Sequence, residues 1–151
     1  MSDNAFVPGY HLVPIRKGVL GELSKIQEEL DELADGHAQK DRILMSVELA
    51  DLYGAMQLFL EKHLPTYTMD DIEQLAAETF IPGPGDLAKL QEALDQLNVD
   101  HSQKSAMACM SLASLFTAID LFVQAHLPGL TLTDVARFSA TTRRAFANGR
   151  R

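Results

Sequence analysis

The chain repeats itself after 64 residues, and this repeat limits what it can fold into more than any other feature. The segment LSKIQEELDEL at residues 23–33 returns as LAKLQEALDQL at residues 87–97, and HAQK at 37–40 returns as HSQK at 101–104. With one residue dropped, ELADLY at 48–53 and HLP at 63–65 return as SLASLF at 111–116 and HLP at 126–128. Chance likeness between amphipathic helices is the alternative, but it does not explain shared loops. The pattern therefore predicts a tandem duplication.

The apolar residues recur at intervals of three and four, which predicts helices and no strands. A first helix from Leu23 is expected to end near Asp35, and a second runs from about 41 to 63, where Pro65 stops it. Thr68 and Asp71 form a capping pair that opens a third helix through residue 80. We therefore expect an all-α fold in which two copies, each a helical hairpin plus a short third helix, close a four-helix bundle as a pseudo-dimer.

The repeat also divides the chain. The first copy covers residues 1–81, the linker PGPG covers 82–85, and the second copy covers 86–151. Neither hairpin can cover its apolar face alone, so we expect the two copies to form one compact unit. The pseudo-dimeric chain can in turn form a homodimer.

Composition excludes several classes of protein. A net charge of −8 disfavours duplex nucleic acid as a partner, because binding it requires cations that neutralise phosphates. The single cysteine, Cys109, excludes an intrachain disulfide and is expected to be buried. The first residues lack the pattern of a secretory signal, and the apolar stretch 106–125 carries polar residues at helical intervals. We therefore expect a cytoplasmic protein without a membrane partner.

Four acidic residues in the first copy are spaced as pairs on successive helices: Glu29, Glu32, Glu48 and Asp51. Residues three apart lie on one side of a helix, so both pairs are expected to meet. Converging carboxylates repel one another and raise their own pKa values unless a cation is present, and Mg²⁺ prefers such oxygen ligands. A solvated acidic helix face is the alternative.

The second copy favours a metal site over a solvated acidic helix face. There the four positions hold no carboxylate: Ala93, Gln96, Ser111 and Ser114. Neighbouring polar residues persist, including Glu92, which matches Glu28. Loss of the four together indicates that they act as a set, as shared metal ligands do.

The spacing EExxE at residues 28–32 followed by ExxD at 48–51 resembles the signature of MazG-type nucleotide pyrophosphohydrolases, relatives of the all-α dimeric dUTPases. The resemblance extends from about residue 11 to 79, and residues 142–149 look like the end of a phage or bacterial member. It implies hydrolysis of nucleoside or deoxynucleoside triphosphates to monophosphate and pyrophosphate, with Mg²⁺ or substitute Mn²⁺, in nucleotide-pool control or house-cleaning. It makes the four acids of the first copy the metal ligands.

The same resemblance leaves Glu28 to orient or deprotonate the attacking water, although the persistence of Glu92 makes a structural role an alternative. Five cations are candidates for neutralising the triphosphate, with ordinary surface charge as the alternative: Lys17, Lys25, Lys40, Arg143 and Arg144. The second copy departs from the motif, so we expect no second catalytic centre. The competing functional hypothesis is an inactive helical interaction or regulatory protein of the same fold. The intact acid set argues against it. The sequence does not indicate a base or sugar preference.

Overall fold

The computed structural model describes the backbone of residues 14–147 and the side chains of residues 14–141. This part of the chain forms six helices and no strand, as the periodicity predicts. The helices are α1 (Leu23–Ala38), α2 (Arg42–His63), α3 (Met69–Glu78), α4 (Leu87–Asp100), α5 (Ser105–His126) and α6 (Leu132–Ala147).

Local sequence signals account for the starts of several helices. Thr68 and Asp71 form a capping box at the start of α3, and Asp41 caps α2 by accepting a hydrogen bond of 3.0 Å from the backbone of Leu44. The expected end of α1 near residue 35 is wrong, because the helix continues to Ala38. In this extra turn α1 packs closely on α2, since a Cβ at Gly36 would lie only 3.2 Å from Leu44 Cγ.

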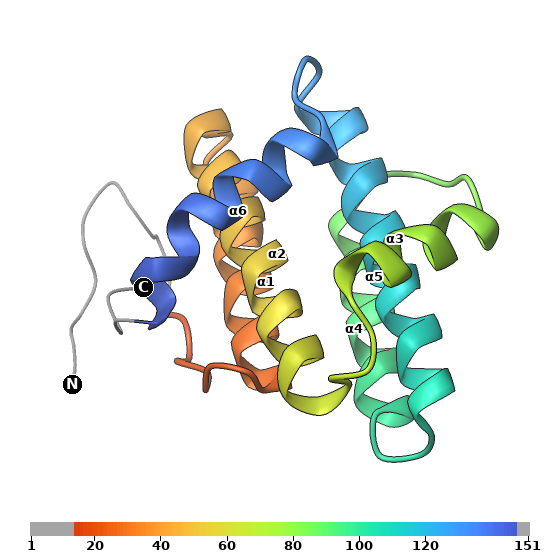
Figure 1. The fold of residues 1–151 in the computed structure, drawn as a ribbon. Coiled ribbons are helices and arrows are strands. Elements are labelled where there is room, and N and C mark those ends of the chain that lie inside the picture. Colours follow the sequence, from red (N-terminus) through yellow and green to blue (C-terminus); the bar gives the residue numbers. More distant parts are fainter. Residues whose placement is uncertain (1–13, 148–151) are drawn as a thin grey trace.

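Four of the six helices form two hairpins, and the helix that follows each hairpin packs on the other one (Figure 1). Helices α1 and α2 pack together, as do α4 and α5, and α1 contacts α4 between the hairpins. Helix α3 then crosses to pack on α5 of the other hairpin, while α6 returns to pack on α2. Each hairpin is therefore covered by a helix from the other part of the chain.

A single hydrophobic core joins the two hairpins. Its largest fully buried side chains include Phe59 of α2 and Phe122 of α5, each with no exposed surface. Cys109 is 4% exposed and belongs to this core, as expected. Because one core contains residues of both hairpins, separating them would expose apolar surface on each.

Residues at matching positions of the repeat meet across the seam between the hairpins. Gln27 and Gln91 exchange two side-chain hydrogen bonds of 2.9 Å. On the α2 and α5 side, the rings of Tyr53 and Phe116 lie 6.3 Å apart. Such pairing of matching residues is typical of a pseudo-twofold relation between two halves.

Four histidines extend this pattern. His37 near the end of α1 lies 4.8 Å from His126 at the end of α5, measured between ring centroids. His63 at the end of α2 lies 4.9 Å from His101, which follows α4. The repeat relates one pair to the other, and each is packed against a core phenylalanine. These histidines therefore serve packing between the hairpins.

Helices α2 and α5 are long and apolar enough to span a membrane by length and composition alone. Within the structure, 72% of the apolar window of α2 and 61% of that of α5 are buried against other helices. Core helices of this kind pass the same test, so it is weak evidence of a membrane span.

Candidate metal centre

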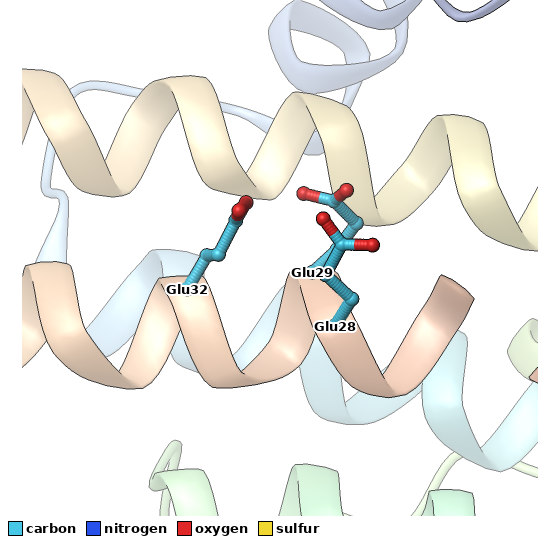
Figure 2. A group of neighbouring side chains, drawn as sticks. All are labelled: Glu28, Glu29 and Glu32. Atoms are coloured by element: carbon cyan, nitrogen blue, oxygen red, sulfur yellow. The ribbon is translucent and has the colours of Figure 1, made fainter. Parts of the chain in front are cut away.

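Five acidic side chains gather where α1 faces α2: Glu28, Glu29, Glu32, Glu48 and Asp51. Figure 2 shows the three glutamates of α1 extending toward α2. Ligand oxygens of Glu29, Glu48 and Asp51 all lie within 4.8 Å of one another, and so do those of Glu28, Glu29 and Glu32. Glu29 belongs to both groups. Of the four acids that the sequence pairs on successive helices, the structure thus groups Glu29 with Glu48 and Asp51, while Glu32 falls in the group with Glu28.

Most of this cluster lies away from solvent. Glu29 is 2% exposed, Glu48 is 0% exposed and Asp51 is 3% exposed, while Glu32 is half-buried. Buried ionised carboxylates are rare unless they are paired or bind a metal, because removal from water is costly. The cluster is therefore not a solvated acidic helix face.

Burial and mutual repulsion change the protonation of these acids. Burial, followed by the charge of Glu32, raises the pKa of Glu29 from near 4.5 to about 9. Burial, followed by the charge of Glu48, raises the pKa of Glu32 to about 7. Without a cation, this site therefore holds protons at neutral pH.

Lys25 supplies a part of the missing positive charge. Its ammonium lies 2.9 Å from Glu29 Oε2 and 3.2 Å from Glu28 Oε1, and its side chain is 4% exposed. It is the one buried cation among residues 14–141, so the carboxylates of the cluster outnumber it.

The two carboxylate oxygens of Glu29 differ in their partners. Glu29 Oε1 accepts no hydrogen bond from the described residues, although Oε2 of the same group is paired with Lys25. Buried polar atoms without partners are uncommon, and one within a group of converging carboxylates suggests a ligand. A hard divalent cation that prefers oxygen donors, such as Mg²⁺, fits this donor set.

A short segment before α1, residues 14–22, is attached to the cluster through Glu28. We call it the strap. The backbone N–H of Gly18 donates a hydrogen bond of 2.8 Å to Glu28 Oε1. A Cβ on Gly18 would lie 2.2 Å from the carbonyl oxygen of Ser24, so this close approach requires glycine. Sequence reasoning missed Gly18, although it included Glu28 among the candidate residues.

The predicted triphosphate-binding cations lie in different places. Lys17, on the strap, is 84% exposed, and its ammonium lies 3.7 Å from Glu28 Oε2. Lys25 is buried and already paired with two carboxylates. Lys40 is exposed in the turn between α1 and α2, eight residues beyond Glu32. Arg143 and Arg144 lie in α6, but their side chains are outside the described part of the chain.

The corresponding part of the second copy is built differently. Asp100, 6% exposed, accepts a hydrogen bond of 2.6 Å from Ser111 Oγ and one of 3.0 Å from Gln96 Nε2. Ser111 and Gln96, which stand where the first copy has Glu48 and Glu32, thus both donate hydrogen bonds to one buried carboxylate. Glu92 is exposed, and the Lys89 ammonium lies 3.5 Å from its Oε1. Sequence comparison missed Asp100 because its partner in the repeat is Gly36, which gives no signal of an acid.

Comparison of the chain with family models, with curated proteins and with solved structures found no match.

Proposed function

We propose that this protein is a Mg²⁺-dependent nucleoside triphosphate pyrophosphohydrolase with a single site, in the first copy. The observation that carries the proposal is the convergence of ligand oxygens from Glu29, Glu48 and Asp51 within 4.8 Å, beside an unpartnered oxygen of Glu29. The motif resemblance to MazG-type enzymes supplies the reaction: cleavage between the α- and β-phosphates. The duplication into an intact and a degenerate copy belongs to the same proposal.

In this proposal the carboxylates of Glu29, Glu32, Glu48 and Asp51 hold Mg²⁺. The bound ion would stabilise the negative charge that develops on the phosphoryl oxygens. Mn²⁺, which accepts the same oxygen ligands, is the expected substitute.

The chain's own residues have separate tasks around that position. Lys25 favours the ionised form of Glu29, with which it forms a buried ion pair. Glu28, the member of the cluster that is not among the four ligands, accepts the proton of the attacking water. Lys17, exposed next to Glu28, contacts the triphosphate. The acidic cluster is mostly buried, so bulk water has little access to it and each of these charge interactions is stronger than it would be in water.

The alternative proposal is an inactive interaction or regulatory protein of the same fold. The degenerate second copy favours it, since half of the chain lacks the ligand set. The buried acids of the first copy favour the enzyme, because converging carboxylates destabilise a fold that makes no use of them. We place the activity in the cytoplasm, in control of the nucleotide pool.

The test uses the purified full-length chain with Mg²⁺ and a panel of triphosphates that includes dUTP, dCTP and the standard nucleotides. We expect at least one substrate to yield monophosphate and pyrophosphate in equal amounts, with loss of both products after chelation. Release of orthophosphate and diphosphate would contradict the proposed bond cleavage. Absence of any product across the panel would favour the inactive alternative.

A further inference from the structure

A cleft of about 320 Å³ lies on the second copy, between α4, α5 and the linker. Three of its lining residues, Ala93, Gln96 and Ser114, stand at positions that hold Glu29, Glu32 and Asp51 in the first copy. Replacement of large acids by smaller or uncharged residues thus coincides with an open space of the size that binds small molecules.

The linker forms a fixed wall of this cleft. A Cβ on Gly85 would lie 2.0 Å from the carbonyl oxygen of Leu121, so the linker backbone is pressed against α5 at this glycine. Pro82 and Pro84, which line the cleft, restrict the backbone before it. Asp86 then caps α4 by accepting a hydrogen bond of 3.0 Å from the backbone of Lys89. The cleft is therefore formed before any ligand binds.

The lining carries hydrogen-bonding groups without net charge. Ser114 and Thr117 offer hydroxyls. The amide nitrogen of Gln96 is used by Asp100, which leaves its Oε1 as an acceptor. Lys89 and Glu92 balance each other's charge.

Apolar groups supply the remaining surface. Ile81 is 76% exposed although it lines the cleft, and Ala93 and Ala118 form part of its floor. Exposed apolar surface in a preformed cleft is typical of a binding site.

We propose that this cleft binds an uncharged nucleoside through its base. A base has flat apolar faces that fit the linker wall, and a polar edge that pairs with Gln96 and the two hydroxyls. Metal-bound triphosphate does not fit, because the lining has a single carboxylate, that of Glu92, and it is already paired with Lys89. The cleft is argued from its own residues, and only the choice of a nucleoside rests on the proposed function.

The experiment titrates the isotopically labelled full-length chain, without divalent metal, with uridine, thymidine, cytidine, adenosine and guanosine in turn. We expect one or more nucleosides to shift the backbone amide signals of residues 93, 114 and 117, whereas inorganic tripolyphosphate does not. Ser114→Phe fills the cleft from an exposed position and should weaken binding about tenfold or more. Met110→Phe is the matched control, because Met110 is 46% exposed on the same helix and does not line the cleft.

Thr117→Val serves as a second variant that removes a hydroxyl with little change of volume, and it should also weaken binding. Thermal melting of each variant shows whether it folds. The inference is overturned if no nucleoside shifts these signals, if Ser114→Phe binds as the original chain does, or if the shifts gather around Glu48 instead. This binding assay is independent of turnover, so an inactive first copy would leave its result unaffected.

Discussion

Gln27 and Gln91, 64 residues apart, exchange two side-chain hydrogen bonds of 2.9 Å across the contact between α1 and α4. Each amide thereby meets its counterpart in the repeat, as in a symmetric dimer interface. The third helices are exchanged in the same reciprocal way, because α3 packs on α5 and α6 packs on α2. The two hairpins depend on each other for burial of their apolar faces.

The first prediction concerns a fragment that contains residues 1–81 alone. Without the second copy, α2 loses its contact with α6, α3 loses its support on α5, and core residues such as Phe59 become exposed. Exposed apolar faces associate with one another, so we expect the fragment to be insoluble or to self-associate. A well-folded monomer, seen by sedimentation and a cooperative thermal melt, would contradict the fused-dimer interpretation.

The second prediction concerns the proposed metal ligands. Glu48→Gln and Asp51→Asn each remove a charged ligand with little change of volume. We expect activity to fall about 100-fold or more, since loss of even an outer partner of a metal ligand costs about 10- to 100-fold. Glu48→Gln should remain folded without metal, because repulsion with Glu32 is relieved when Glu48 is neutral.

The control for these variants lies in the second copy. Asp95→Asn changes an exposed acid of α4 that does not line the cleft, and it should leave activity unchanged. Full activity of Glu48→Gln with Mg²⁺ would remove that residue from the site.

The third prediction separates two roles of Glu28. In Glu28→Gln the amide oxygen still accepts the hydrogen bond from Gly18, so the strap stays attached. The variant cannot take up a proton, and loss of a general base costs about 100-fold or more in rate. We expect that loss in steady-state kinetics, and a lower melting temperature because Lys25 loses one of its two buried carboxylate partners. Retained activity would leave Glu28 with the anchoring role alone.

The fold was predictable where local chemistry decides it. Capping at Thr68 and Asp71 and the apolar intervals mark the helices, and the repeat indicates two hairpins. Which hairpin each third helix covers was not predictable. The apolar face of α3 fits either hairpin by periodicity, and tertiary packing selects α5.

The site was predictable to a similar extent. The three-residue spacing of Glu29 with Glu32 and of Glu48 with Asp51 places each pair on one helix face, and packing of α1 on α2 brings the pairs together. The hydrogen bond from Gly18 to Glu28 depends on the path of the strap, which has no periodic signal.

The fourth prediction concerns pH and metal. The pKa of Glu29, about 9, and that of Glu32, about 7, exceed the usual value near 4.5 that applies in the unfolded chain. Between about pH 4.5 and about pH 9 the folded state therefore binds more protons than the unfolded chain. The stability that these two groups contribute is fully present below about pH 4.5, and it is lost as the pH rises through about 7 and about 9. We expect the metal-free protein to melt at a lower temperature at pH 8.5 than at pH 6.

Mg²⁺ should act in the opposite direction, because it binds the ionised carboxylates and competes with protons. We expect the ion to raise the melting temperature more at pH 8.5 than at pH 6, as measured by scanning calorimetry. Glu48→Gln is the matched control, and its melting temperature should depend less on pH and less on Mg²⁺. Equal shifts at the two pH values would contradict the metal assignment.

The most direct test of the metal centre is the anomalous signal of Mn²⁺ in crystals of the full-length chain. We expect a signal beside Glu29, Glu48 and Asp51 and none beside Ser111, where the hydroxyl donates to Asp100. A single buried carboxylate does not offset the dehydration of a divalent cation, whereas the clustered acids of the first copy do. Equal signal at both positions, or no signal at the first, would contradict a metal centre retained in the first copy alone.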